Sequence, residues 1–283
     1  MSIKVAKNLF GKDKDTLVQF YETNKDNVIN YSKKNANNLL ICNYNVHGWV
    51  NINDTINVND NFDNIINMIS NCNDIDIIVL EEVCFRQKDG LTQQFIENKF
   101  KTIGFVDNFT VENGGCFLKK GACDYIMIFG KKPFSIKHSI NITEFIFKRL
   151  CLLIEYDKIK IIAVHLEIGK RFHHLPKNKH RSDIEKENTA MRIKELTYIL
   201  QCVKNIDIIV GDFNFSYQDP EFNWVLDKGF EYCKDLTHTT PYNRTDMVFV
   251  NNNNNKLINV NNVTINANFS DHLPIICELI LKT

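Results

Sequence analysis

Short apolar runs rich in isoleucine and valine recur along the chain, separated by polar segments. Runs of this length are too short for buried helices and are typical of β-strands that are covered on both faces of their sheet. They predict strands at Leu39–Tyr44, Ile75–Leu80, Tyr125–Phe129, Cys151–Ile154, Ile159–Val164, Ile206–Val210, Met247–Val250 and Ile275–Leu281.

A second pattern, with apolar residues three and four positions apart, predicts amphipathic helices between the strands. It is clearest over Phe62–Ile69 and Asn188–Val203, and weaker over Leu91–Phe100 and Glu221–Leu226. Strands outnumber helices, and the two do not alternate strictly. We therefore expect two packed sheets with helices outside them, an α/β sandwich.

The chain reads as one large domain. Its 283 residues are close to the size at which a single hydrophobic core stops growing, and no linker rich in proline, glycine or serine divides it. We expect this domain to cover residues 36–283, and the polar, charged residues 1–35 to form a loosely packed arm.

Charge and cysteine content limit the class of protein. The 34 basic residues balance the 34 acidic ones, so binding to nucleic acid requires a local basic patch. Nine cysteines without a C-x-x-C pair indicate reduced thiols. There is no apolar signal segment, and no apolar run approaches the ~18 residues of a membrane span. We expect an intracellular protein, cytoplasmic or nuclear, that is monomeric.

Polar side chains gather where the predicted strands begin or end. Strand ends hold side chains rigidly at a cleft, although each of these residues alone is most simply a turn or a helix cap. Their joint occurrence predicts a single functional site. The candidate residues are Asn45, Glu82, His165, Asp212, Asn214, Asp246, Asp271 and His272.

The donor atoms in this set indicate the chemistry. Carboxylate and amide oxygens suit Mg²⁺ or Mn²⁺ better than zinc. Two histidines and a further carboxylate remain for proton transfer and phosphate binding. A metal-assisted hydrolytic site needs these parts: a Lewis acid, a positioned water and donors for the developing charge.

In order along the chain, six motifs resemble those of the endonuclease/exonuclease/phosphatase superfamily, the deoxyribonuclease I-like proteins. The resemblance extends over roughly residues 39–281. It implies a four-layered α/β sandwich in which helices flank two packed mixed β-sheets. The motifs are Asn43-Tyr44-Asn45-Val46-His47-Gly48, Leu80-Glu81-Glu82-Val83, Val164-His165-Leu166-Glu167, Gly211-Asp212-Phe213-Asn214, Arg244-Thr245-Asp246-Met247-Val248-Phe249 and Ser270-Asp271-His272-Leu273-Pro274-Ile275.

The resemblance also implies roles for the oxygen donors. Glu82 is implied as the principal ligand of a Mg²⁺ or Mn²⁺ ion, with Asn45 and Asp271 near the metal. Asp212 would orient and deprotonate the attacking water, and Asn214 would donate to the phosphoryl oxygen.

The two histidines are implied as contacts of the reacting phosphate. Asp246 would hold His272, which binds the phosphate, and His165 would stabilise the transition state. Many nucleases of the superfamily carry aspartate where this chain has His47, and imidazole is a poorer ligand for Mg²⁺ than a carboxylate. A second metal ion at this corner is therefore not expected.

Candidate substrate contacts lie around these motifs. Residues 169–181 carry five Lys or Arg and three His without an acid. Lys170 and Arg171 could clamp a phosphate backbone, and Phe172 could stack on a base. A solvated loop and a zinc site at His173, His174 and His180 are the alternatives for this segment. Trp49 is a further candidate, either as a base contact or as a core residue.

Arg149, before the strand that leads to His165, is similar to its counterpart in the 5′-tyrosyl-DNA phosphodiesterase branch, and is a candidate substrate contact. The sequence thus predicts a divalent-metal-dependent phosphodiesterase acting on nucleic acid or its ends, as a 5′-tyrosyl-DNA phosphodiesterase or as an endo- or exonuclease. The alternatives are an enzyme acting on a phosphoinositide, sphingomyelin or another small phosphoester, and an inactive binding module on the same fold.

Overall fold

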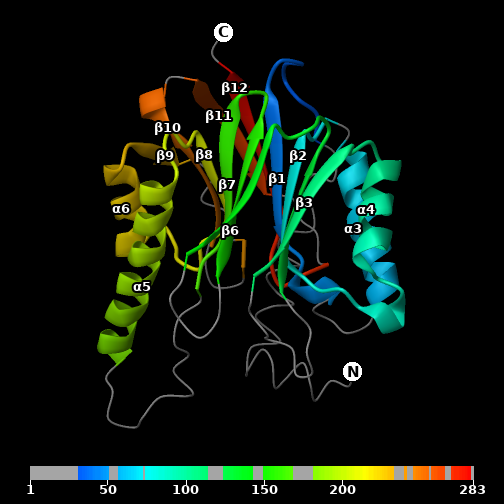
Figure 1. Ribbon diagram of the computed structural model, residues 1–283, viewed down its shortest axis with the longest axis horizontal. Helices are drawn as coiled ribbons and strands as arrows, with labels where there is room; N and C mark the ends of the chain where they lie inside the picture. The colour runs from blue at the N-terminus through cyan, green and yellow to red at the C-terminus, as the bar shows by residue number, and fades with distance from the viewer. Residues whose placement is uncertain are drawn as a thin grey trace.

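The computed structural model describes residues 31–50, 57–72, 74–113, 124–142, 149–167, 181–232, 239–240, 245–254, 256–264 and 269–281. Two six-stranded sheets lie face to face at its centre (Figure 1). Helices flank the sheets on both sides, so the predicted four-layered α/β sandwich is confirmed.

The first sheet has the order β11-β12-β1-β2-β4-β3. Its β1 pairs in parallel with β2 and antiparallel with β12, so the sheet is mixed. The strands are β1 (Leu39–Asn45), β2 (Ile77–Val83), β3 (Asp107–Glu112), β4 (Tyr125–Gly130), β11 (Leu257–Thr264) and β12 (Ile275–Leu281).

The second sheet has the order β5-β6-β7-β8-β10-β9. It is also mixed, because β7 and β8 run parallel while β8 and β10 run antiparallel. The strands are β5 (Ile136–Asn141), β6 (Leu150–Tyr156), β7 (Ile159–His165), β8 (Ile208–Asp212), β9 (Phe230–Tyr232) and β10 (Asp246–Asn251).

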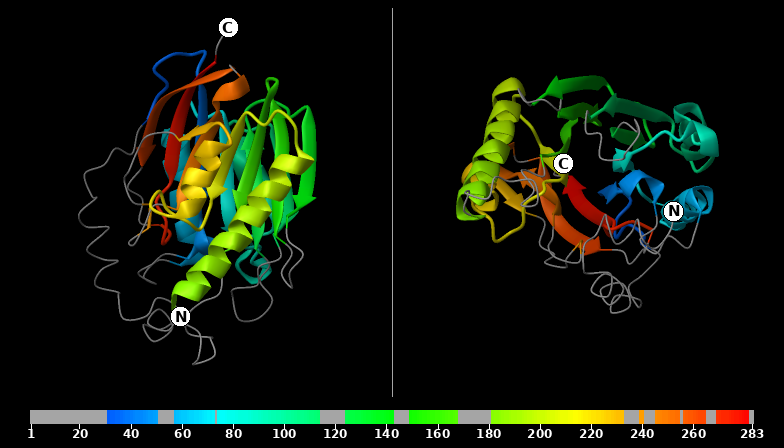
Figure 2. Two further views of the ribbon diagram at one scale, coloured as in Figure 1. Left: turned by 90° about the vertical axis from the view of Figure 1, so that its left-hand side faces the viewer. Right: turned by 90° about the horizontal axis from the view of Figure 1, so that it is seen from below.

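Among the described residues, two helices cover the outer face of each sheet. Figure 1 shows α3 (Val58–Asn71) and α4 (Gln93–Thr102) on one side of the sandwich and α5 (Arg181–Cys202) and α6 (Pro220–Asp227) on the other. The view from below in Figure 2 shows the same separation. Short 3₁₀ turns form at His47–Trp49, Gln87–Asp89 and Asn252–Asn254. No helix in the described ranges is long and apolar enough to cross a membrane.

The apolar side chains form three layers of core. In β1, Leu39 and Ile41 point into the layer between the sheets, whereas Leu40, Cys42 and Tyr44 point towards α3 and α4. A third layer packs the second sheet against α5 and α6. Because both faces of the central strands are buried, these strands read as continuous apolar runs in the sequence.

The four strands that the apolar runs did not predict are all at the sheet edges. They are β3 and β11 in the first sheet and β5 and β9 in the second. An edge strand has one neighbour and more solvent contact, so it does not need a continuous apolar run. In β5, for example, only Ile140 is buried.

Helix α5 begins at Arg181, seven residues before the predicted start at Asn188. Its first two turns contain mostly charged and polar residues, so they lack the apolar stripe on which the prediction depended.

The segment just before β1 is bound to the first sheet. Glu278 of β12 accepts hydrogen bonds from the Tyr31 hydroxyl (2.7 Å), from the backbone N–H of Lys34 (2.6 Å) and from Asn38 Nδ2 (2.6 Å). Lys33 pairs with Asp76 at 2.6 Å. Residues 1–30 of the predicted arm lie outside the described residues.

Candidate active site

The strand register brings the polar residues of the six motifs to one end of the sandwich. The parallel pairs β1/β2 and β7/β8 place their carboxyl ends together, with Asn45 beside Glu81 and His165 beside Asp212. The antiparallel partner β10 begins at the same place, because Asp246 pairs with Asp212. A single site is therefore built from both sheets.

Glu82 lies at an irregularity in β2. The register between β2 and β4 shifts between Leu80 and Val83, and Glu82 has a positive φ of 52°. Such a bulge redirects a side chain from the regular alternation of a strand. It leaves the Glu82 carboxylate partly exposed, with 23% of the side chain accessible.

Asn45 joins two carboxylates. Its Nδ2 donates to Glu82 Oε1 and to Asp212 Oδ2, both at 3.2 Å, and its Oδ1 accepts the backbone N–H of His47 at 3.1 Å. Ser270 Oγ donates to the Asn45 carbonyl oxygen at 2.7 Å. The Asn45 amide thus spaces Glu82 from Asp212, and its fixed position also ties β1 to the segment that carries Asp271.

Hard oxygen donors for a divalent cation face the solvent at this corner. Glu82 and Asp271 are each about a fifth exposed and both lie next to the His47 ring, with Nδ1 at 3.1 Å from Glu82 Oε2 and 3.4 Å from Asp271 Oδ1. Burial opposes protonation of His47, but Asp271 and Glu82 outweigh it and raise its pKa to about 9. The same contacts lower the pKa of Glu82 against the effect of burial. The Glu82 and Asp271 carboxylates fit Mg²⁺ or Mn²⁺, whereas the Asn45 amide turns its nitrogen towards Glu82 and its oxygen towards the His47 N–H.

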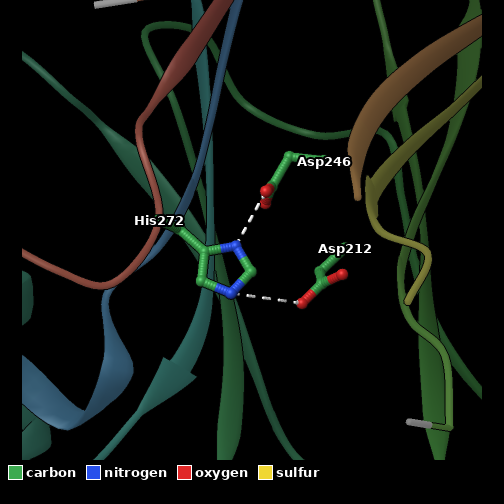
Figure 3. A group of neighbouring side chains, drawn as sticks. All are labelled: Asp212, Asp246 and His272. Atoms are coloured by element: carbon green, nitrogen blue, oxygen red, sulfur yellow. Dashed lines mark hydrogen bonds and ion pairs between the residues drawn. The ribbon is translucent and has the colours of Figure 1, made fainter. Parts of the chain in front are cut away.

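Asp246, His272 and Asp212 form a row across the site (Figure 3). His272 Nδ1 lies 2.7 Å from Asp246 Oδ2, and its Nε2 lies 3.8 Å from Asp212 Oδ2. These three residues form a compact cluster that could hold an ion. However, two ligands of one ion with bonds of about 2.1 Å lie about 3 Å apart or more. The 2.7 Å contact is instead a hydrogen bond that fixes the imidazole.

The acids around the fixed imidazole of His272 favour its protonated form. Burial lowers its pKa, but Asp246, Asp212 and Asp271 outweigh burial and hold the pKa well above the ordinary value. With Nδ1 bound to Asp246, Nε2 of His272 points towards Asp212 (Figure 3). His272 is therefore a cationic donor suited to a phosphoryl oxygen.

His165 is a second imidazole close to Asp212. It is 2% exposed, and its Nε2 lies 3.7 Å from Glu82 Oε1 and 3.8 Å from Asp212 Oδ2. Its Nδ1 lies 3.4 Å from Asp124 Oδ2. Burial and Arg149 lower the pKa of His165, but Asp124 and Asp212 raise it by more, so the net shift is upward.

Asp124 was not predicted as a site residue. It directly precedes β4, so it is one more acid joined to an apolar strand, the signal that identified the others. The sequence gives no indication that its partner is a histidine 41 positions away.

Arg149 is buried beneath the site. It is 1% exposed, and its guanidinium pairs with Asp124 at 3.2 Å and with Glu167 at 3.4 Å, beside His165 Nδ1 at 3.4 Å. The structure does not support the prediction that Arg149 contacts substrate, because its guanidinium pairs with two protein carboxylates, Asp124 and Glu167. Arg149 positions the acid that holds His165.

Trp49 is also a core residue. It is fully buried, packs edge-to-face on Phe62 with ring centroids 5.0 Å apart, and donates its indole N–H to the Cys84 carbonyl at 3.0 Å. The prediction of a base contact is wrong for Trp49, since no ring face is free. The other three predicted substrate contacts, Lys170, Arg171 and Phe172, lie outside the described residues.

Asp212 lies at the centre of these contacts. It is 1% exposed, and its Oδ1 accepts the backbone N–H of Asn214 at 2.9 Å. Burial and Asp246 raise its pKa, while His272 and His165 lower it, and the net shift is upward. A carboxylate with a raised pKa is a better general base than an ordinary one.

The turn after β8 fixes Asp212 and Asn214. Asn214 has a φ of 52°, and its Nδ2 donates to the Leu166 carbonyl at 2.8 Å. Gly211 has a φ of 145°, and a Cβ there would lie 1.8 Å from the Val164 carbonyl oxygen. Only glycine allows β8 to approach β7 so closely, and this approach sets Asp212 beside His165.

Glu195 of α5 is a buried acid behind the site. It is 2% exposed and accepts the backbone N–H of Glu167 at 3.1 Å. Burial raises its pKa to about 7, although that hydrogen bond and the nearby Arg149 and Arg192 lower it.

This raised pKa predicts a pH-dependent stability. Above pH 4.5 the unfolded chain loses the Glu195 proton while the folded protein retains it until about pH 7, so stability falls over this interval. We expect Glu195→Gln to remove this loss. Its free energy of unfolding should exceed that of the wild type by about 3 kcal/mol at pH 8, but not at pH 4.5. Denaturant titrations at both pH values measure the difference. Glu185→Gln, on an exposed position of α5, is the control, and an equal gain at pH 4.5 would contradict the assignment.

Comparison with known proteins finds similarity of structure alone. No family model matches the sequence, and neither does a curated protein. Among solved structures, an endonuclease/exonuclease/phosphatase from Beutenbergia cavernae superposes with a TM-score of 0.66 at 14% identity, covering 87% of this chain and 72% of that one. The chain has the fold of the endonuclease/exonuclease/phosphatase superfamily.

Two further structures share this fold. The human Nocturnin catalytic domain with bound sulfate superposes with a TM-score of 0.65 at 14% identity, covering 88% of this chain and 95% of that one. D. rerio TDP2 complexed with a single-strand DNA product gives 0.56 at 17% identity, covering 86% and 98%. The sequence-based assignment to this superfamily's fold is therefore confirmed.

Proposed function

We propose that this protein is a divalent-metal-dependent phosphodiesterase that hydrolyses phosphoester bonds by in-line attack of water. One observation carries the proposal: Asp212 Oδ2 lies 3.8 Å from each of two imidazole Nε2 atoms, those of His165 and His272. A carboxylate close to two protonated imidazoles can accept a proton from water while the imidazole N–H groups bind the attacked phosphoryl group.

The metal corner supplies the electrophile. Glu82 and Asp271, with the Asn45 amide beside them, would hold Mg²⁺ or Mn²⁺, which polarises a phosphoryl oxygen when bound. The Asn45 amide lies between Glu82 and Asp212 and donates to both. It keeps Glu82, which would bind the cation, separate from Asp212, which would act as the base.

The chain's own residues accept the proton from water and stabilise the negative charge that develops on the phosphoryl group. Asp212 orients the water and takes its proton at Oδ2. The cationic His272, held by Asp246, donates its Nε2–H to a non-bridging phosphoryl oxygen, and His165, held by Asp124, does the same. Asn214 is fixed next to these groups by its bond to Leu166 and is placed to add a further donor.

For the substrate, we propose nucleic acid, and in particular its 5′ ends carrying an adduct. Two observations support this choice. The basic residues 169–181 follow directly after the strand that ends at His165, and TDP2, which shares the fold, is known in complex with a single-strand DNA product. A net charge of zero favours recognition of an end over broad electrostatic binding along a duplex.

A cleavage panel tests both parts of the proposal. Metal-depleted protein is incubated with Mg²⁺, Mn²⁺ or EDTA and with single- and double-stranded DNA, an abasic duplex, a 5′-phosphotyrosyl oligonucleotide, RNA, a phosphoinositide and sphingomyelin. We expect metal-dependent release of tyrosine and a 5′-phosphorylated oligonucleotide, lost in Glu82→Gln. Release of a lipid headgroup alone would contradict the substrate. No metal-dependent turnover of any substrate would contradict the enzyme and favour a binding module.

A further inference from the structure

We propose that His47 is a nitrogen ligand of the divalent cation, and that it makes this site select Mn²⁺ over Mg²⁺. The inference rests on the proposed function in one respect, that Glu82 and Asp271 hold a cation. It adds a ligand of different chemistry and, with it, the identity of the preferred ion.

The backbone holds His47 at the metal corner in an unfavourable conformation. His47, Gly48 and Trp49 have φ values of 42°, 63° and 65°, three successive residues in the left-handed region. Such conformations cost free energy for non-glycine residues and persist where the surroundings enforce them. Here the buried Trp49 ring and the hydrogen bond from the His47 N–H to Asn45 Oδ1 enforce them.

The result of this turn is the position of one atom. His47 Nδ1 lies 3.1 Å from Glu82 Oε2 and 3.4 Å from Asp271 Oδ1. With metal–ligand bonds of about 2.1 Å, neighbouring ligand atoms lie about 3.0 Å apart in octahedral and about 3.4 Å apart in tetrahedral coordination. His47 Nδ1 therefore lies at the separation from each carboxylate oxygen that two ligands of one ion adopt.

The ring also has access to solvent, which a cation-binding site needs. The side chains of His47, Glu82 and Asp271 are 21%, 23% and 21% exposed. In the part of the chain that the structure describes, the recorded ion pairs of Glu82 and Asp271 are all with histidines. A bound cation would therefore displace the proton of His47, which these two carboxylates stabilise, and not a lysine or arginine of the described residues.

Ligand chemistry then predicts the metal. Mg²⁺ binds hard oxygen donors and keeps several waters, and it gains little from an imidazole. Transition metals gain from imidazole nitrogen, in the order Mn²⁺ < Fe²⁺ < Co²⁺. When His47 Nδ1 takes the place of an oxygen ligand, the affinity of the site for Mn²⁺ and the ions that follow it rises relative to its affinity for Mg²⁺.

Calorimetric titration of the metal-free protein with MnCl₂ and with MgCl₂ tests the preference. Aspartate and asparagine, like histidine, are enriched in the left-handed region, so His47→Asp and His47→Asn preserve the turn. We expect His47→Asn to weaken Mn²⁺ binding about 10-fold or more and Mg²⁺ binding less than about 3-fold. We expect His47→Asp to raise Mg²⁺ affinity relative to Mn²⁺. An unchanged ratio of the two affinities in both variants would overturn the inference.

Electron spin-echo spectroscopy of bound Mn²⁺ detects the ligand directly. The wild type should show ¹⁴N modulation from a coordinated imidazole, His47→Asn should lose it, and His165→Gln should retain it. Modulation that persists in His47→Asn would overturn the inference.

Glu82→Gln separates the two levels of the argument. If this variant binds both metals as the wild type does, the proposed metal corner is wrong. Suppose instead that Glu82→Gln loses both metals while the His47 variants leave the affinity ratio unchanged. The proposed metal site is then supported, and the proposal that His47 is a ligand is wrong.

Discussion

Asp212→Asn is expected to lower kcat by about 10³- to 10⁴-fold without loss of folded structure. Asparagine has the same shape and can keep one of the two contacts, with Asn45 Nδ2 or with the Asn214 N–H, but it cannot accept a proton from water. Because Asp212 is buried next to Asp246, removing its charge relieves repulsion, and the variant should be at least as stable as the wild type.

Single-turnover kinetics and thermal unfolding of the same preparation measure both effects. Asp63→Asn, on an exposed position of α3, is the matched control and should leave kcat unchanged. If Asp212→Asn retained more than about a tenth of the activity, the proton acceptor would be a different group and the mechanism would be wrong.

Arg149→Met is expected to destabilise the protein by about 3–5 kcal/mol, because it leaves a buried acid without its cation. Among the described residues, Asp124, with 5% of its side chain exposed, would keep His165 and Asn113 as partners. Asp124 holds His165, so the variant should also lose activity at temperatures where it remains folded. Denaturant unfolding and kcat at a low temperature measure the two losses.

Arg192→Met is the matched control for this prediction. Arg192 is buried and pairs with the fully buried Glu221 at 2.6 Å, between α5 and α6. We expect a similar loss of stability in Arg192→Met with kcat unchanged in the folded protein. Equal losses of kcat in both variants would show that Arg149 acts through stability alone and does not position His165.

The interior strands could be predicted from the sequence, whereas the edge strands could not. Strands such as β1 and β7 are buried on both faces, and burial leaves an uninterrupted apolar run. β11, with its alternation of asparagine and apolar residues, gives no such signal. It is defined by its pairing with β12, a contact between distant segments.

The residues of the site could be predicted because they share a topological position. Asn45, His165 and Asp212 each end a buried strand, and parallel strands bring such ends together. The sequence does not reveal how far a polar side chain is buried. Arg149 was therefore predicted as a substrate contact, and Trp49 either as a base contact or as a core residue, although both belong to the interior.

The left-handed turn at His47–Trp49 shows the same limit at the level of the backbone. The sequence marks His47 as a departure from the motif, but not the conformation that sets its ring between two carboxylates. That placement depends on the packing of Trp49 in the core, a tertiary contact that no local pattern indicates.

The most direct test of the central claim is hydrolysis in ¹⁸O-labelled water, using the nucleic-acid substrate that the panel identifies, with Mn²⁺ or Mg²⁺ added to the metal-depleted protein. Water attack at phosphorus predicts one ¹⁸O atom in the phosphate of the product and none in the released alcohol, with no turnover in Asp212→Asn. Label in the alcohol, or a product without label, would contradict a phosphodiesterase in which Asp212 activates water against phosphorus.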